Sequence, residues 1–217
     1  MKNIIFIAPP ASGKGTYSSM LKKNYSYTHI STGDVLRSIS SSNTDLGKEV
    51  AEVLQSGNLV NDELMFRIIR QELEKLDPSK PFILDGLPRT LDQTKYLDTL
   101  FEELGLSNYV VLYLETDYEI ALKRALGRIT CPKCHATYNK YFDAFKPKVE
   151  NKCDICNEEL VSRTDDNEES FKIRFENYNT NTKPILDYYQ EKEKLVKINT
   201  GDFTNEQIFD IILDVVN

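Results

Sequence analysis

The chain of 217 residues is long enough for one large domain with insertions, on a prior of roughly 150 residues per domain. Hydrophobic residues make up 40% and charged residues 28%, which excludes the disordered, collagen-like and coiled-coil classes. With 27 Lys and Arg against 34 Asp and Glu, the net charge of −7 gives no general attraction to nucleic acids or anionic membranes. We therefore expect a globular protein with neither partner, in which any phosphate binding is local.

The start of the chain holds only a five-residue apolar run, Ile4 to Ala8, which is too short for a signal-peptide core or a membrane span. No later segment approaches 18 apolar residues. We therefore predict a cytoplasmic protein. In that reducing compartment, four cysteines between positions 131 and 156 favour metal binding over disulfides.

Short apolar runs bounded by polar residues, Gly or Pro predict buried strands. In chain order they are Ile4 to Ala8, a weaker run at Tyr27 to Ile30, then Phe82 to Leu84, Tyr109 to Leu114 and Leu195 to Ile198. Segments with apolar residues at helical spacing lie between several of them. This alternation predicts an α/β fold, with a five-stranded parallel sheet covered by helices on both faces.

Two regions interrupt the alternation of strands and helices. Residues 31–60 carry helical patterns without a strand, and residues 129–163 contain Cys, Lys and Pro with little helical periodicity. We interpret both as insertions into a core formed by residues 1–30, 61–128 and 164–217.

A long helix is expected after the second insertion, from Glu168 to Lys192. Asp166 or Asn167 is well suited to cap its N-terminus, because a short side-chain oxygen accepts from the first free N–H groups. Pro184 is expected to kink or interrupt this helix, since proline lacks the N–H and clashes with the preceding turn.

A loop of small residues joins the first strand to a helix. It reads Ala8-Pro9-Pro10-Ala11-Ser12-Gly13-Lys14-Gly15-Thr16, and such a loop directs backbone N–H groups and a lysine at an anion. The pattern departs from G-x-x-x-x-G-K-[ST], because Ala8 takes the first Gly position and the hydroxyl comes one residue late, at Thr16. An ordinary turn with a surface lysine is the alternative interpretation of the loop alone. Because Pro9 and Pro10 favour extended backbone before them, we predict negative φ at both Ala8 and Ala11.

Several further motifs follow this loop in order. They are Ser31-Thr32-Gly33-Asp34-Val35-Leu36-Arg37, Gly57-Asn58-Leu59-Val60, Asp85-Gly86-Leu87-Pro88-Arg89-Thr90 with Gln93, Gly127-Arg128, two Cys-x-x-Cys pairs, and Arg163 to Glu168 with Arg174. Together, over nearly the whole chain, they resemble the adenylate kinase family and in particular its long-lid bacterial members. Leu87 stands where Phe is usual in that family, a conservative apolar change. The resemblance implies a P-loop nucleoside monophosphate kinase fold with residues 31–60 as AMP-binding domain and 129–163 as a zinc-bearing lid.

The activity that the resemblance implies is reversible phosphoryl transfer from MgATP to AMP, giving two ADP, by a monomeric enzyme. Such a transfer needs cations that hold the phosphates in line, and arginine supplies a planar, permanently charged fork. The chain has eight arginines among its 27 basic residues, and six of the eight fall on positions of the family pattern. This use of arginine supports the implied chemistry.

The resemblance assigns roles to individual residues. For catalysis it implies Lys14, Asp85, Arg89, Arg124, Arg128, Arg163 and Arg174. For ATP binding it implies Ala11, Ser12, Gly13, Lys14, Gly15, Thr16, Arg124, Arg128 and Tyr138. For AMP binding it implies Thr32, Arg37, Leu59, Val60, Gly86, Arg89, Gln93, Arg163 and Arg174. Because Asp85 ends a predicted strand, its carboxylate is expected at the carboxyl edge of the sheet, where the resemblance has it hold Mg²⁺ through water.

The four cysteines form two Cys-x-x-Cys pairs separated by 18 residues, Cys131 with Cys134 and Cys153 with Cys156. This spacing is typical of a tetrahedral zinc held by four thiolates, which is a closed and therefore structural site. Two disulfides or free thiols are the alternatives. His135 is interpreted as a bystander because four sulfurs are already available, and His29 as a packed or capping residue rather than a catalyst.

Three other functions are compared with this hypothesis. Asn151-Lys152-Cys153-Asp154 spells the N-K-x-D of P-loop GTPases, but no buried strand precedes it. A zinc-ribbon nucleic-acid-binding protein is disfavoured because residues 129–163 carry six basic against five acidic residues. A kinase of another nucleoside monophosphate is the nearest alternative. By the resemblance, Gln93 and Thr32 favour AMP, and the long Cys-bearing lid favours adenylate kinase.

Overall fold

A computed structural model describes residues 1–200 and 204–217. Its main sheet is parallel, with the strand order β2-β3-β1-β4-β7. The strands are β1 (Asn3–Ile7), β2 (Thr28–Ser31), β3 (Phe82–Asp85), β4 (Tyr109–Glu115) and β7 (Leu195–Asn199). Each coincides with a run predicted from sequence, so the α/β class and the five-stranded parallel sheet are confirmed.

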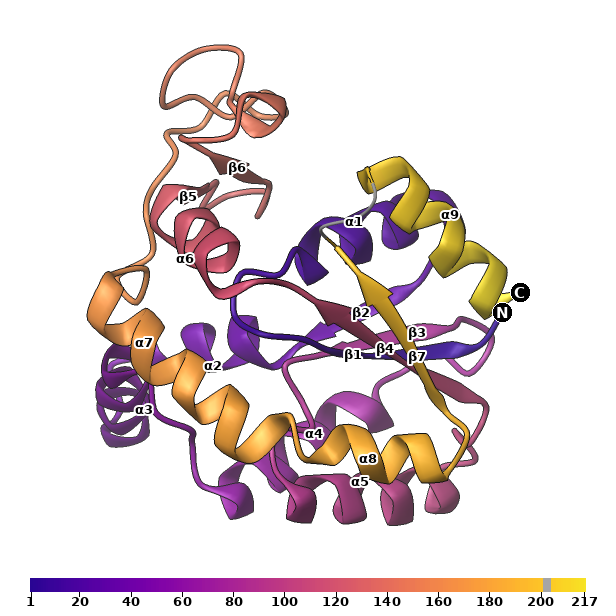
Figure 1. Ribbon diagram of the computed structural model, residues 1–217. Helices are drawn as coiled ribbons and strands as arrows, with labels where there is room; N and C mark the ends of the chain where they lie inside the picture. The colour runs from indigo at the N-terminus through magenta and orange to yellow at the C-terminus, as the bar shows by residue number, and fades with distance from the viewer. Residues whose placement is uncertain (201–203) are drawn as a thin grey trace.

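Alternate side chains of the central strand β1 enter two separate cores, because successive residues of a strand point to opposite faces. Ile5 and Ile7 pack with side chains of α4 (Asp62–Glu74), α5 (Leu91–Glu103) and α8 (Ile185–Glu191). Ile4 and Phe6 pack with α1 (Lys14–Tyr25) and α9 (Asn205–Val216). Figure 1 shows these two helical layers on opposite faces of the sheet, as the sequence predicts.

The two interrupting regions form structures outside the sheet. The first contains α2 (Thr32–Ser40) and α3 (Asp45–Ser56), which pack against each other. The second follows α6 (Tyr118–Gly127) and contains the antiparallel pair β5 (Arg128–Thr130) and β6 (Thr137–Asn139), with a short 3-10 helix, η1 (Asp143–Phe145). Sequence periodicity did not indicate β5 and β6, because three residues are too few to show alternation. In Figure 1 this second region stands away from the sheet.

The long helix expected after the second insertion is present in two parts. Asn167 caps α7 (Glu168–Asn177), its side chain accepting from the Ser170 N–H at 2.9 Å. A π-helical segment, η2 (Tyr178–Thr182), and Pro184 then separate α7 from α8. Both the cap and the interruption predicted at Pro184 are confirmed.

Helix α7 also holds the end of α3. The Ser170 hydroxyl donates to the Gln55 carbonyl at 2.8 Å, and the Asn177 amide donates to the Gly57 carbonyl at 3.2 Å. Gly57 has φ +79°, and a Cβ there would lie 2.9 Å from the Ser170 carbonyl oxygen. Only glycine fits this turn, which fixes the loop that continues to Leu59 and Val60.

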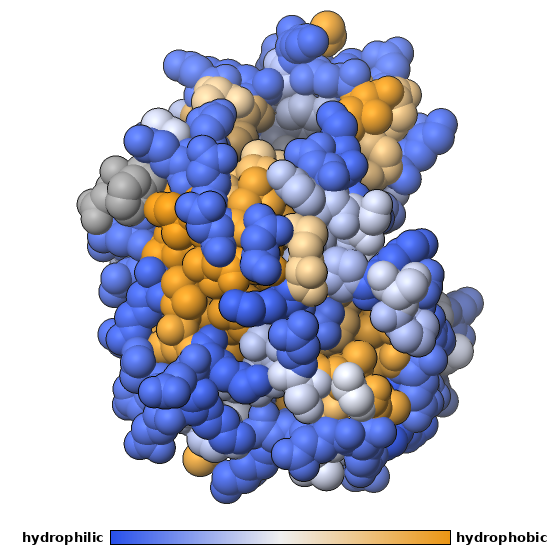
Figure 2. Space-filling model, turned by 90° about the vertical axis from the view of Figure 1, so that its right-hand side faces the viewer, coloured by the Kyte–Doolittle hydropathy of each residue, from blue (hydrophilic) through white to orange (hydrophobic). Residues whose placement is uncertain are grey.

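The surface seen in Figure 2 is hydrophilic over most of its area, with apolar side chains gathered in a few places between charged ones. Across residues 1–200 and 204–217, no helix is long and apolar enough to cross a membrane.

Candidate active site

The loop between β1 and α1 ends at the positive end of a helix. Gly13 caps α1 with φ 99° and ψ 5°, and no side chain caps the first free N–H groups of the helix. The side chain of Ser12 is buried, and its hydroxyl has no partner among the described residues. Free backbone donors at a helix N-terminus, beside a lysine at its first position, form an anion-binding arrangement.

The prediction that Ala11 has negative φ is wrong. Its φ is 58°, in the left-handed region, whereas Ala8 lies outside that region as predicted. Pro9 and Pro10 restrict only the residues that precede them, so they leave the conformation of Ala11 free. In this loop an alanine adopts a conformation that strains L-residues by roughly 1–2 kcal/mol.

The two loop alanines therefore form a matched pair for mutagenesis. Both methyl groups are partly buried against core clusters, so Ala8→Gly and Ala11→Gly lose similar packing and both add unfolded-state entropy. Only Ala11→Gly relieves strain. We expect it to be more stable than Ala8→Gly by about 1–2 kcal/mol in urea unfolding, the size of the left-handed strain. Equal free energies of unfolding for the two variants would show that Ala11 is unstrained.

Lys14, Asp85 and His29 meet at the carboxyl end of the sheet. The Lys14 ammonium lies 3.9 Å from one Asp85 oxygen, and His29 Nε2 lies 3.8 Å from the other. Burial lowers the pKa of Lys14, with Asp85 acting in the opposite direction. Burial also opposes the charge on Asp85, but Lys14 and His29 outweigh it and lower the pKa of this carboxyl group. Asp85 is thus an ionised carboxylate beside the anion-binding loop, at the position predicted from the end of its strand.

This carboxylate fits a magnesium site of the kind used with nucleotides. Mg²⁺ prefers oxygen ligands and keeps several of its waters, with one or two carboxylates and substrate phosphates completing the site. Asp85 is ionised and partly open to solvent, with a side-chain exposure of 15%. The side chains paired with its two oxygens are Lys14 and His29, and neither is acidic.

An open hollow lies between the sheet, α2 and the loop after α3. Its lining includes eight of the nine residues that the resemblance assigned to AMP: Thr32, Arg37, Leu59, Val60, Gly86, Arg89, Gln93 and Arg174. Gly86 has φ +89°, and a Cβ there would lie 2.4 Å from the Thr32 hydroxyl oxygen. Glycine is therefore required where the chain turns from β3 into this hollow.

Arg89 is fixed in the hollow by its own backbone turn. Its Nε donates to the Gly86 carbonyl at 2.7 Å, which leaves the terminal guanidinium nitrogens for a ligand. Burial, followed by repulsion from Arg174, lowers the pKa of Arg89 to about 10, so the side chain is still a cation at neutral pH. A second hollow beside the first is lined by Arg37 and Arg163. Burial and the nearby Arg128 lower the pKa of Arg163, also to about 10.

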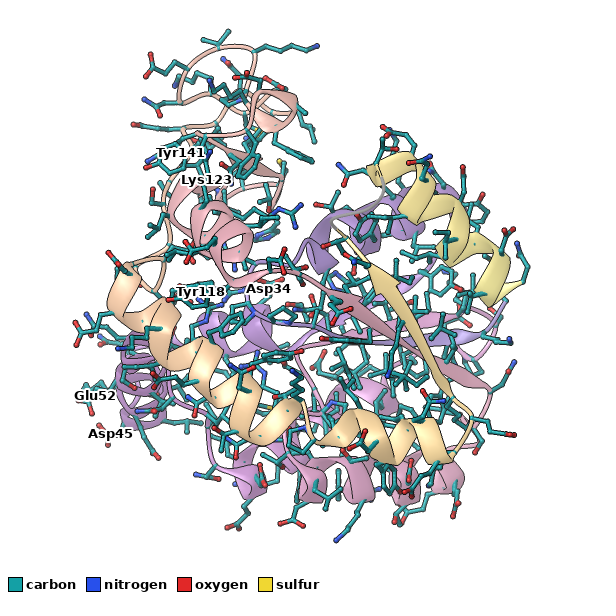
Figure 3. All side chains as sticks on the ribbon, in the orientation of Figure 1. Asp34, Asp45, Glu52, Tyr118, Lys123 and Tyr141 are labelled. Carbon is teal, nitrogen blue, oxygen red and sulfur yellow. The ribbon has the colours of Figure 1, made fainter. Side chains whose placement is uncertain are left out.

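Three further arginines near the two hollows, Arg128, Arg174 and Arg37, form ion pairs with carboxylates. Together with Arg89 and Arg163 they are called the arginine cluster below. Arg128 makes a two-pronged ion pair with Asp166, whose side chain is 1% exposed. Arg174 donates to Asp165 at 3.0 Å. Arg37 pairs with the exposed Asp34 at 2.5 Å, one turn apart on α2. In Figure 3 Asp34 lies near the centre of the view, whereas Asp45 and Glu52 lie on the outer side of α3. These ion pairs fix the positions of the three guanidinium groups. A phosphate can form the same kind of charge-assisted hydrogen bond with arginine, so it could take the place of a carboxylate.

Arg124 and Tyr138 lie farther along, toward the second insertion. Arg124 approaches the Ser12 carbonyl of the loop at 3.4 Å, and its own carbonyl accepts from the Asn139 amide at 2.9 Å. The Tyr138 hydroxyl lies 3.5 Å from Cys153 Sγ and accepts from the Asp154 N–H at 2.8 Å. The structure therefore directs this hydroxyl into the cysteine cluster rather than toward the loop.

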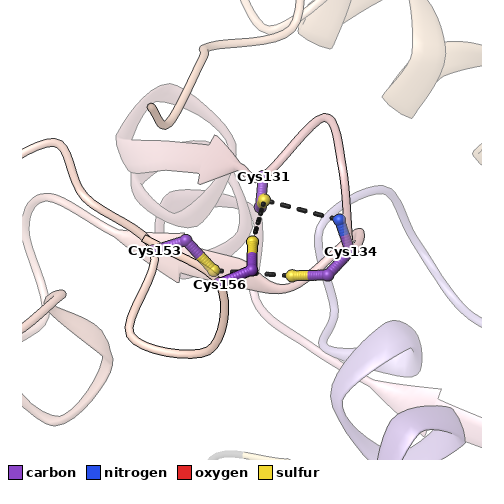
Figure 4. A group of neighbouring side chains, drawn as sticks. All are labelled: Cys131, Cys134, Cys153 and Cys156. Atoms are coloured by element: carbon purple, nitrogen blue, oxygen red, sulfur yellow. Dashed lines mark hydrogen bonds between the residues drawn. The ribbon is translucent and has the colours of Figure 1, made fainter. Parts of the chain in front are cut away.

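The four cysteines converge, as Figure 4 shows, although they come from two separate turns. All four sulfurs lie within 4.8 Å of one another, and the thiols are free. Burial opposes ionisation of Cys153, but hydrogen bonds from Tyr138 and from backbone N–H groups outweigh it and lower its pKa to about 6. Four sulfurs at this separation fit the ligand shell of a tetrahedral thiolate metal site. His135 is not a member of this four-residue group.

One polar residue of the site was not found from sequence. Asp62, in the first turn of α4, accepts from the Gln93 amide at 2.6 Å. The only available signal was its place after Asn61, the N-cap of α4, and that pattern indicates a helix start rather than a site.

The parallel sheet with two insertions is the fold of a P-loop nucleoside monophosphate kinase. The loop before α1, the carboxylate of Asp85 and the arginines around the two hollows form a site of the kind that this class of enzyme uses. The model of the family described as "Adenylate kinase" matches residues 6–194. An adenylate kinase of Thermosipho africanus is 40% identical over 214 residues, covering 99% of each chain. One of Caldanaerobacter subterraneus is 41% identical over 209 residues, covering 96% of this chain and 93% of the relative. The chain belongs to the adenylate kinase family.

Proposed function

We propose that the protein transfers a phosphoryl group reversibly from MgATP to AMP, giving two ADP. The observation that carries this proposal is the convergence of Lys14 and the arginine cluster beside Asp85, at the carboxyl ends of β1 and β3. Ligands of open α/β sheets bind at this edge. Family membership supports the same chemistry. Two polyanions need such cations to approach each other.

The roles of individual residues follow from their positions. Lys14 and the N–H groups of Ala11 to Gly15 would bind the donor phosphates, with the Thr16 hydroxyl and Arg124 beside them. Arg37 and Arg89 would hold the acceptor phosphate, because both line the first hollow. Arg89 would also donate to the charge that develops during transfer. Arg128 lies close enough to Arg163 and Arg174 to act with burial in lowering the pKa of each. These three arginines would stabilise the transferring group. Mg²⁺, when bound with ATP, supplies charge neutralisation at the phosphates, and Asp85 would accept from its waters.

The two insertions are proposed to have separate tasks. Residues 31–60 would form the AMP-binding domain, supported by the part that Thr32, Arg37 and Leu59 take in lining the first hollow. Residues 129–163 would form a lid over ATP, held together by structural zinc on the four cysteines. The core would comprise residues 1–30, 61–128 and 164–217. That the protein is a monomer, is located in the cytoplasm and lacks nucleic-acid partners stays a prediction.

An acceptor scan tests the proposed function. MgATP is offered with AMP, GMP, CMP or UMP, and ADP formation is followed by a coupled assay. We expect kcat/KM for AMP to exceed that for each of the other three by at least about tenfold, since the first hollow carries an amide that can read a purine edge. A preference for CMP or UMP would replace the proposal by a pyrimidine nucleotide kinase.

A further inference from the structure

The amide of Gln93 is held between two partners of opposite hydrogen-bonding character. Its Oε1 accepts from the backbone N–H of Arg89 at 2.7 Å, and its Nε2 donates to Asp62 Oδ1 at 2.6 Å. A backbone N–H can only donate and an ionised carboxylate can only accept, so both partners require the same orientation of the amide. The side chain is 2% exposed, which leaves little room for another arrangement.

Asp62 is itself fixed by the starts of two helices. It lies in the first turn of α4, behind the N-cap Asn61, and its second oxygen accepts from the hydroxyl of Thr90 at 3.3 Å. Thr90 in turn is the N-cap of α5, where its oxygen accepts from the Gln93 N–H. A carboxylate between two helix N-termini is electrostatically favoured, because both ends carry partial positive charge.

Gln93 lines the first hollow, whereas Asp62 is not among the described residues that line it. With one bond made on each side, the amide retains one lone pair on Oε1 and one hydrogen on Nε2. An adenine edge presents a ring acceptor next to a 6-amino donor, which matches such a pair. A 6-oxo purine replaces that donor by an acceptor, so it would need the amide turned over.

We propose that Asp62 is a specificity-determining positioning residue, which locks the Gln93 amide so that the acceptor hollow selects a 6-amino purine over a 6-oxo purine. This inference rests on the proposed function. Asp62 does not touch the base and acts only through Gln93. Turning the amide over would set Oε1 against the Asp62 carboxylate and Nε2 against the Arg89 N–H, two repulsive contacts in a buried place.

AMP and IMP are the matched probes, since IMP differs at the 6-position and lacks the extra 2-amino group of GMP. Asp62→Leu removes the carboxylate and excludes water from its place. We expect the ratio of kcat/KM for AMP to that for IMP to fall at least about tenfold, while KM for ATP stays within about twofold of wild type. Asp62→Asn can present either an acceptor or a donor to Gln93, so it weakens the lock without removing its polar partner, and its ratio should lie between those of wild type and Asp62→Leu.

Glu63→Leu is the control for the lost charge, because Glu63 is exposed in the same first turn of α4. Glu63→Leu should leave the ratio of kcat/KM for AMP to that for IMP unchanged. If Asp62→Leu does not fold, Asp62→Ala provides a second variant without the carboxylate. A folded Asp62→Leu or Asp62→Ala in which rates with AMP and IMP fall together, at an unchanged ratio, would reduce Asp62 to a structural contact and overturn the inference. Failure of the wild type to use AMP would instead overturn the proposed function itself.

Discussion

Arg89→Lys is expected to lower kcat by about 10²–10³ while the fold stays intact, the range measured when one donor to a developing charge is removed. The Arg89 side chain bonds the Gly86 carbonyl through Nε and still presents its two terminal nitrogens to the first hollow. Lysine has a single nitrogen, so it cannot bond Gly86 and form a fork around a phosphate at once.

The backbone of residue 89 does not depend on this side chain. Its N–H donates to Gln93, and its carbonyl accepts from the Thr182 hydroxyl at 3.0 Å. Circular dichroism and the thermal midpoint should therefore match wild type. Arg67→Lys is the matched control, because Arg67 is an exposed arginine on α4, outside the proposed site. Near-normal turnover of Arg89→Lys, or an equal loss in Arg67→Lys, would remove Arg89 from the proposed transfer step.

The elements that sequence predicts well are those whose burial pattern is continuous. β4 is buried at six successive positions, Tyr109 to Leu114, and β1 at four, so both appear in the sequence as unbroken apolar runs. Parallel strands covered on both faces have this pattern for a physical reason, since neither face meets water. The position of Asp85 followed from the same logic, because a polar residue that ends a buried strand must emerge at the sheet edge.

Features set by contacts between distant segments could not be predicted in this way. Asp62 reaches Gln93 across 31 positions of sequence, and the Tyr138 hydroxyl meets a cysteine 15 positions away. The left-handed conformation of Ala11 is similar, because it depends on how the whole loop closes between β1 and α1. Residue type argued against this conformation, because the left-handed region is disfavoured for alanine.

Cys153→Ser is expected to release the proposed zinc and loosen the proposed lid, residues 129–163, while the sheet stays folded. Cys153 is buried in a small cluster with Ile129, Cys131 and Leu160, apart from the two cores that cover the sheet. Little other apolar burial holds residues 129–163 together, so the free energy of binding the proposed zinc would be a large part of their folding free energy. Loss of one thiolate from a closed four-sulfur site leaves three ligands and a weaker complex.

The metal content of purified protein measures this directly. We expect about one zinc per wild-type chain and less than about half of that in Cys153→Ser after dialysis against a mild chelator, in keeping with a site of four thiolates. Hydrogen exchange should quicken in β5 and β6 but not in β1 or β4, and heat stability should fall before activity does.

His135→Asn is the control, because His135 has φ 61°, which asparagine tolerates, and it belongs to no ligand group among the described residues. A closed zinc site requires all four thiolates on the ion. The proposal of a structural zinc would therefore be contradicted if purified wild-type protein held no stoichiometric metal. Disulfides among these cysteines under reducing conditions would contradict it as well.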